Sequence, residues 1–156
     1  MKTRKEVSQI DWARLAAFID GEGCIRIDLQ QPSAGNNFTA RHLLEVRVYS
    51  TDPRLILWCR NTFGGGNYKP VGRPHKEHHK QEHVWYVGAV NAETVLNNCL
   101  PYFIIKREQA EVDLAFRSLG GKHGQKVTPE LFEARESCRE EMGRLNKRGR
   151  SPEVVQ

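Results

Sequence analysis

The chain has 156 residues and a formal net charge of +5, with 38% hydrophobic and 28% charged residues. This length supports one compact domain with its own core and is too short for two comfortable ones, and the composition excludes a largely disordered chain. The modest basic excess favours a polyanionic partner without identifying one.

The cysteines are widely separated and form no CxxC pair: they are Cys24, Cys59, Cys99 and Cys138. That spacing argues against a zinc ribbon or a disulfide framework, so we expect reduced thiols. Near the N-terminus the apolar run is short and broken by Asp11 and Arg14. We therefore expect no signal peptide and no membrane span, which favours a cytoplasmic or organellar-matrix location rather than secretion.

The first predicted element is a helix over residues 10–20, where apolar side chains recur at helical spacing. Ala13, Ala17 and Gly21 lie four residues apart and form a ridge of small residues that permits close approach of a second helix. Two acids, Asp20 and Glu22, follow at the helix C-terminus. Because the helix dipole disfavours negative charge there, a cation, a special turn or solvent must compensate for them.

Two strands are predicted next, because apolar and polar residues alternate over residues 24–30 and again up to about residue 49. Residues 31–37 between them are rich in Pro, Gly and Asn and predict a loop. The side chains expected to point away from the core are Arg26, Asp28, Gln30, Arg41, Glu45 and Arg47.

A helix over residues 53–63 follows, with an N-cap among residues 50–52 and three glycines at its end. A second strand pair is expected at residues 67–71 and 83–90, then two helices separated near Pro101, and a last helix from residue 129 to about 148. This order predicts an α+β fold with an antiparallel sheet and helices on one face, in a single domain over residues 1–148 with a disordered tail at 149–156.

The segment LAAFIDGEG (15–23) resembles the signature of the LAGLIDADG homing endonucleases. Glu22 stands where the second acid of the signature belongs, and Ala17 replaces its usual glycine. A second segment, LPYFIIKREQA (100–110), resembles a later landmark of the family, a Pro followed by Lys and then by Gln-Ala. The likeness touches most of residues 10–120 in the family's order.

This resemblance implies an αββαββα core whose twisted antiparallel sheet forms a saddle over DNA, with the helices on its other face. A chain with one motif implies a homodimer with the signature helices side by side, and the implied interface residues are Ala13, Ala16, Ala17, Asp20 and Gly21. The implied activity is Mg²⁺-dependent, site-specific cutting of both DNA strands at a long pseudo-palindromic site, leaving 3′ overhangs. Mn²⁺ would replace Mg²⁺, Ca²⁺ would substitute without cleavage, and intron or intein homing is the implied biology.

The resemblance also implies the catalytic residues. Glu22 of each subunit and the carbonyl of Gly21 would bind the metal, and Lys106 would polarise the water network or steady the phosphate charge. Carboxylate-held divalent ions suit this chemistry, because they activate water and neutralise charge on the attacking and leaving oxygens. The family's water-positioning Gln falls near Tyr49 or Ser50, so that role stays unassigned, and a basic residue that sometimes follows it is replaced near Asp52.

Arg and Gln side chains read guanine and adenine edges in the major groove, and acids read cytosine. The outward strand residues are therefore candidate DNA contacts, or else an ordinary solvated sheet face. The second strand pair and its loop add the candidates Tyr68, Lys69, Arg73 and His83. The histidines of the segment 73–83 match no standard zinc spacing, so DNA contact is preferred over a zinc site.

Two other functions use the same scaffold: a group I intron RNA maturase that binds its own intron RNA, and a non-catalytic DNA-binding regulator. Both predict nucleic-acid binding that survives Glu22→Gln. A third alternative is a small α+β protein with no nucleic-acid role, in which Asp20 and Glu22 are solvated acids at a helix-terminating turn and Lys106 is a surface residue.

Overall fold

The computed structural model describes residues 6–35, 39–64, 66, 69–71, 80–121 and 126–147. In chain order its elements are α1 (Gln9–Glu22), β1 (Gly23–Gln30), β2 (Arg41–Ser50), α2 (Pro53–Phe63), β3 (Lys69–Val71), β4 (Glu82–Gly88), α3 (Ala89–Cys99), a short 3₁₀ turn (Leu100–Tyr102), α4 (Arg107–Ser118) and α5 (Pro129–Leu145). The α+β class predicted from the sequence is confirmed.

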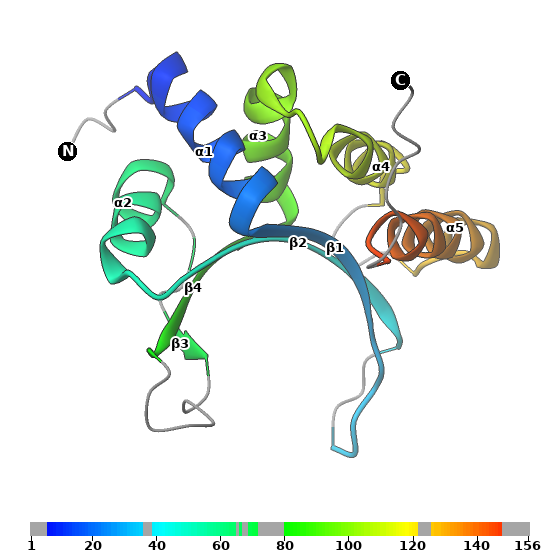
Figure 1. The fold of residues 1–156 in the computed structure, drawn as a ribbon. Helices are drawn as coiled ribbons and strands as arrows, with labels where there is room; N and C mark the ends of the chain where they lie inside the picture. The colour runs from blue at the N-terminus through cyan, green and yellow to red at the C-terminus, as the bar shows by residue number, and fades with distance from the viewer. Residues whose placement is uncertain are drawn as a thin grey trace.

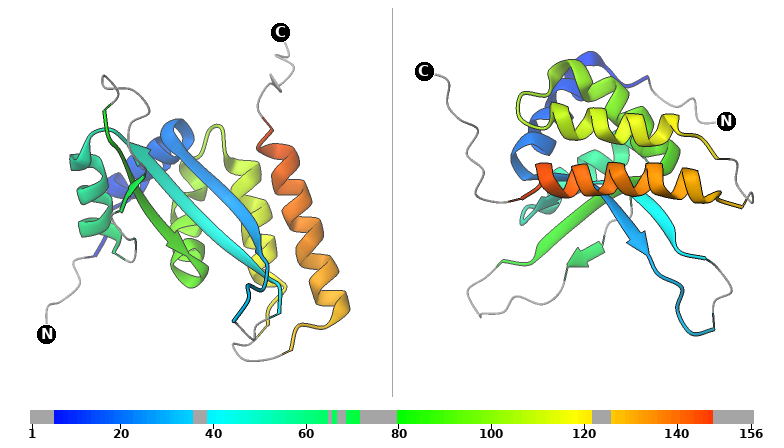
Figure 2. Two further views of the ribbon diagram at one scale, coloured as in Figure 1. Left: turned by 90° about the horizontal axis from the view of Figure 1, so that it is seen from below. Right: turned by 90° about the vertical axis from the view of Figure 1, so that its right-hand side faces the viewer.

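The strands form one four-stranded sheet in the order β1-β2-β4-β3, with every neighbouring pair antiparallel. The two predicted strand pairs are therefore joined into one sheet by pairing of β2 with β4, in which Val48 lies opposite Trp85. The sheet is strongly curved, and the described helices all lie on its convex side (Figure 1). Seen from below in Figure 2, the strands lie in front of the helices and the concave side is open.

The core lies between the convex face of the sheet and the helices. Alternate strand residues such as Ile25, Val46 and Trp85 are fully buried, and they pack with Leu15 and Ile19 of α1. This burial of apolar surface is the main stabilising contribution to the fold. Residues of opposite parity on the same strands face the concave side, the open face of the sheet.

The junction between α1 and β1 contains no loop. The helix extends beyond the predicted end at residue 20, through Gly21 to Glu22, and β1 begins at Gly23. A Cβ at Gly23 would lie 2.6 Å from the Cα of Ile19 and 2.9 Å from the carbonyl oxygen of Arg47. Since backbone atoms cannot move aside, only glycine fits there, and this junction holds the end of α1 against the sheet.

Two polar side chains lie within the core. His42 on β2 is packed between the rings of Phe116 and Phe132, and its Nε2 lies 2.7 Å from Oε2 of Glu136 on α5. Asp113 on α4 is fully buried, and neither carboxylate oxygen has a hydrogen-bond partner among the described residues. Burial alone raises the pKa of Asp113 to about 9, so this carboxyl is protonated at neutral pH.

Some element boundaries differ from those predicted. The strand expected over residues 83–90 ends at Gly88, because Ala89 and Val90 already belong to α3. The N-cap of α2 is Asp52, whose carboxylate accepts from the backbone N–H of Arg54.

All four cysteines are free thiols. Within the described ranges, the helices lack the length and apolar content needed to cross a membrane.

Candidate catalytic hollow and nucleic-acid interface

Asp20 at the end of α1 binds the start of α4. Its carboxylate accepts three backbone N–H groups, from Ile104 at 2.8 Å, Ile105 at 3.2 Å and Lys106 at 2.9 Å. The N-cap residue of α4, Lys106, makes no capping bond with its own side chain. Asp20 therefore caps α4 from another helix, and the partly positive N-terminus of α4 compensates its charge.

The Lys106 side chain returns to the same helix end. Its Nζ donates to the backbone carbonyl of Asp20 at 2.8 Å, so an ammonium lies at the partly negative C-terminus of α1. The cation that the acids at this helix end required is thus Lys106. Asp20 and Lys106 together bind α1 to α4 and set where the Lys106 side chain lies.

A hollow of about 700 Å³ opens beside this junction. It brings together the three residues proposed for catalysis and metal binding, Gly21, Glu22 and Lys106. The remaining lining residues come from every part of the chain: Gly23, Cys24, Tyr49, Glu82, Gln109, Leu145 and Asn146. Of these, only Tyr49 is a position that the sequence links to the site, because the others belong to elements far apart in the sequence.

Glu22 is exposed and forms no hydrogen bond or ion pair with any described residue. No group of three or more His, Cys, Asp or Glu side chains in the described ranges could hold a metal ion. One protomer thus offers the carboxylate of Glu22 and the nearby carbonyl of Gly21, and Glu82 of β4 adds a second carboxylate to the lining of the hollow. These oxygen donors fit Mg²⁺, which uses few protein carboxylates and keeps water and phosphate oxygens as its other ligands.

The open face carries polar side chains on both long strands. At its outer part Arg41 Nε donates to Oε1 of Gln30 at 2.8 Å. Nearer the hollow lie four charged side chains in contact with one another: Arg26, Asp28, Glu45 and Arg47. The six strand residues predicted to point away from the core do so. Tyr86 of β4 also lies on this face, with Arg47 5.9 Å above its ring, and was not predicted there.

The structure places the candidate His83 on the side of the sheet opposite to the open face. His83 pairs with Ser50 and alternates with Val84, so it shares the side of Trp85, toward the helices. Lys69 lies in β3 with its backbone opposite Val84. The candidates Tyr68 and Arg73, and the other histidines of the segment 73–83, lie outside the described residues.

Four of the five residues predicted for a helix–helix interface divide into two groups, and the fifth, Asp20, binds the start of α4. Ala17 and Gly21 are exposed and Ala13 is half-buried, so these three form a ridge accessible to another molecule. Ala16 is fully buried in the protomer core, so its prediction as an interface residue is wrong. Ala16 was implied only by the family resemblance, and it lies outside the four-residue spacing that relates Ala13, Ala17 and Gly21.

The turn after β2 contains the position where the family's glutamine was expected. Tyr49 lines the hollow, whereas the hydroxyl of Ser50 accepts from the backbone N–H of Asp52 within the turn. Asp52 also pairs with Arg54, whose hydrogen bonds lower the pKa of Asp52 to about 2. A basic side chain, Arg54, therefore does follow this turn, two residues after the position considered from the sequence.

No protein-family model matches this sequence, and no curated protein matches it. Solved structures do match. The homing endonuclease I-CvuI, in complex with the I-CreI target in the presence of Mg, has a TM-score of 0.72 at 21% identity over 92% of this chain and 87% of its own. The archaeal intron-encoded homing endonuclease I-Vdi141I, complexed with DNA, has a TM-score of 0.70 at 14% identity over 90% of this chain and 86% of its own.

A third match is the LAGLIDADG homing endonuclease I-GzeII, in complex with its DNA target, with a TM-score of 0.56 at 18% identity. It covers 85% of this chain but only 45% of its own, so this chain spans about half of that protein and most of I-CvuI. The chain has the fold of the LAGLIDADG homing endonucleases. The resemblance to their single-motif members, predicted from the segments 15–23 and 100–110, is confirmed at the level of the fold.

Proposed function

We propose that this protein is a divalent-metal-dependent, site-specific DNA endonuclease that acts as a homodimer and cuts both strands, leaving 3′ overhangs. One observation carries the proposal. Glu22, a carboxylate with no partner among the described residues, shares a hollow with Lys106 beside the open face of a homing endonuclease fold. Several proteins with this fold were solved in complex with DNA, and one of them in the presence of Mg.

In this proposal Glu22 and the Gly21 carbonyl of each protomer hold Mg²⁺ or Mn²⁺, with Ca²⁺ as a non-cleaving substitute. When bound, the metal activates water and neutralises charge on the scissile phosphate. Lys106 keeps its ammonium beside the hollow through its bond to the Asp20 carbonyl, and there it steadies phosphate charge or orders water. A second copy would add its own Glu22 and Gly21 carbonyl to the metal-binding set.

The exposed ridge of α1 supports the homodimer. Ala13, Ala17 and Gly21 would allow the α1 helices of two copies to approach closely, and a Cβ built at Gly21 meets nothing within 4 Å in the protomer. Ile10 lies three residues before Ala13 on the same face of α1, and it is 72% exposed. It therefore extends the ridge with an apolar side chain. Packing of the two ridges would bring both copies of Glu22 to the dimer axis.

The open face supports binding to duplex DNA. It is concave, it is covered by no described helix, and its side chains include the types that hydrogen-bond base edges. The proposed contacts within the described residues are Arg26, Asp28, Gln30, Arg41, Glu45 and Arg47. Two protomers side by side would present two such faces to a long pseudo-palindromic site.

Cleavage of a randomised duplex-DNA library with Mg²⁺ tests the proposal, with Glu22→Gln in parallel. We expect the wild type to produce double-strand cuts with a symmetric consensus. Glu22→Gln should bind the selected site as well or better, because it removes a negative charge near phosphate, yet should not cut it. Glu111→Gln, the same change at an exposed residue of α4 outside the hollow, is the matched control and should cut normally.

Salt-sensitive binding without cutting, in the wild type as in Glu22→Gln, would contradict the enzyme and favour a maturase or a regulator. Comparison of the selected DNA with structured intron RNA would then separate those two. Absence of salt-sensitive binding to either nucleic acid would exclude all three functions.

A further inference from the structure

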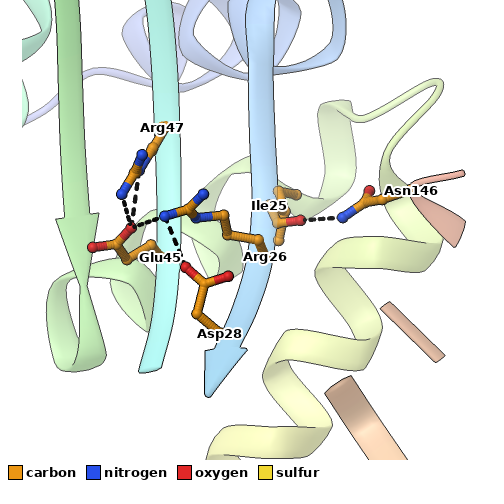
Figure 3. Close-up of polar contacts among 6 residues, drawn as sticks. All are labelled: Ile25, Arg26, Asp28, Glu45, Arg47 and Asn146. Atoms are coloured by element: carbon orange, nitrogen blue, oxygen red, sulfur yellow. Dashed lines mark hydrogen bonds and ion pairs between the residues drawn. The ribbon is translucent and has the colours of Figure 1, made fainter. Parts of the chain in front are cut away.

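The ion cluster on the open face has Glu45 at its centre (Figure 3). Oε2 of Glu45 accepts from Arg47 through Nε at 2.9 Å and Nη2 at 2.6 Å, and from Arg26 through Nη2 at 3.2 Å. Arg26 Nη2 is also 2.7 Å from Oδ2 of Asp28. One carboxylate on β2 therefore holds two guanidinium groups, one from each long strand.

The cluster lies next to the candidate catalytic hollow. Arg47 is directly opposite Cys24, which lines the hollow, and Arg26 is directly opposite Glu45. The pair of Arg41 and Gln30 lies farther along the same strands, at the other end of the β1–β2 register. On DNA that spans the open face, the Glu45 cluster would meet base pairs near the scissile bond, and Arg41 would meet base pairs farther out.

The cluster carries two positive and two negative charges and is neutral overall. A neutral cluster attracts phosphates weakly, and phosphate attraction supplies most sequence-independent binding to DNA. The arginines nearest the hollow should therefore bind the phosphate backbone of non-target DNA only weakly.

Arginine has five N–H groups, and the carboxylates of the cluster engage only one nitrogen of Arg26 and two of Arg47, which also hydrogen-bonds Tyr49. Arg47 is further fixed by its position over the Tyr86 ring. The Nε of Arg26 is buried and has no hydrogen-bond partner among the described residues, so the resting contacts do not satisfy all of its donors. A guanine edge that offers two acceptors competes well for such a side chain.

We propose that Glu45 is a specificity-determining positioning residue. It holds Arg26 and Arg47 for contact with base edges beside the hollow and withholds their charge from the phosphates of non-target DNA. This inference rests on the proposed function, since it assumes that duplex DNA occupies the open face. An ordinary surface ion pair would contribute little to stability and nothing to sequence preference.

Glu45→Gln is the decisive variant, because it keeps the shape and an acceptor oxygen while removing the charge. Its matched control is Glu93→Gln, which makes the same charge change in an Arg–Glu pair, with Arg117, on the helix side of the sheet. The first measurement is binding to random-sequence duplex DNA without metal over a salt series. For Glu45→Gln we expect about tenfold tighter binding at low salt and a salt slope steeper by about 1–2, as for one or two additional phosphate contacts. Glu93→Gln should match the wild type.

The second measurement selects a randomised duplex library by binding. Glu45→Gln should lose about tenfold of its base preference at the positions nearest the centre of the site and keep it at the outer positions. Asp28→Asn frees only one contact of Arg26, so it should show a smaller loss at the same positions. Equal unfolding midpoints of the variants would show that binding, rather than folding, has changed.

Salt slopes and base preferences of Glu45→Gln equal to those of Glu93→Gln would overturn the inference and leave the endonuclease proposal intact. A uniform loss of preference over the whole site would overturn it as well, because it would indicate general loosening. If the wild type shows no salt-sensitive DNA binding, the proposed function fails, and the inference fails with it.

Discussion

β2 carries a glutamate-centred ion cluster on each of its sides, and the two differ in what surrounds them. Toward the helices, His42 meets Glu136, which also binds Arg139, and the His42 side chain is 1% exposed between two phenylalanine rings. On the open face, Glu45 meets two arginines whose side chains are 26% and 32% exposed. The first cluster joins α5 to the sheet, whereas the second joins only the two strands.

This difference determines whether a mutation should change the stability of the fold or the binding of a ligand. A group between two packed layers loses contacts on both sides when it is changed, so its effect appears in the free energy of unfolding. A group on the open face is packed on one side only, so its mutation should remove few contacts of the folded protein. It can also exchange its hydrogen-bond partners for those of a ligand. Neighbouring residues of one element, pointing to opposite sides, should therefore have opposite phenotypes.

Trp85 and Tyr86 of β4 give the largest contrast. Trp85 is fully buried on the helix side, so Trp85→Ala should lower the free energy of unfolding by about 3–5 kcal/mol. Tyr86 lies on the open face, so Tyr86→Ala should cost less than about 1 kcal/mol but weaken DNA binding. Urea unfolding and DNA titration of both variants measure this. Similar losses of stability in both would mean that the open face is packed against something in solution.

Asp113 is a buried carboxyl of the covered side with no hydrogen-bond partner among the described residues, and Asp113→Asn tests what this costs in stability. Its pKa is raised from 3.8 to about 9, so below pH 4 the carboxyl is protonated in both folded and unfolded chains and costs nothing. Above pH 4 the unfolded chain releases the proton and the folded chain retains it, so stability falls as the pH rises toward 9. Asn does not titrate, and the variant should therefore gain stability relative to the wild type over this range.

We expect this gain to be on the order of 2–3 kcal/mol at pH 8 and near zero at pH 4. Urea unfolding at several pH values measures it, with Glu111→Gln on the exposed side of α4 as the control. A difference between Asp113→Asn and the wild type that does not change with pH would contradict the buried, protonated carboxyl.

Ala16 and Ala17 of α1 give the smallest contrast in stability. Ala16→Leu overfills the core and should cost about 1–3 kcal/mol, whereas Ala17→Leu on the exposed ridge should change stability by less than about 0.5 kcal/mol. If α1 forms the proposed dimer interface, Ala17→Leu should still raise the dimer dissociation constant about tenfold or more. Sedimentation equilibrium measures this, and Ala115→Leu, at an exposed alanine of α4, should leave the dimer unchanged.

Local sequence pattern predicted most of the fold. Strict alternation in β1 and β2 identified the buried face correctly, because each strand has only one side covered by helices. The pattern missed His42, which occupies a core position as a polar residue because Glu136 and two aromatic rings receive it from elements many residues away. Pairing of β2 with β4 was likewise not encoded in either strand alone, and it appeared only when the whole sheet was assembled.

The sequence predicted those residues of the candidate site that belong to the two family motifs, and not the other residues of its lining. Glu22, Gly21 and Lys106 were identified by resemblance, and the hollow contains all three. Glu82, Gln109 and Asn146 were not, because each comes from a different element and only the fold brings them together. Asn146, for example, donates to the Ile25 carbonyl at 2.8 Å across a separation of 121 residues, a contact with no local signal.

The hydrogen bonds between Asp20 and the start of α4 also bear on the order in which the chain acquires its properties. They join residues separated by 84 to 86 positions, so they can form only after the chain has been synthesised through β1, β2, α2, β4 and α3 to Lys106. Contacts of such long range form late in folding, since the chain must first lose the entropy of the intervening loop. A nascent or partly folded chain therefore carries Glu22 without a correctly placed Lys106. For a protein that would cut DNA, this delay would prevent cleavage by a chain that is still incomplete or only partly folded.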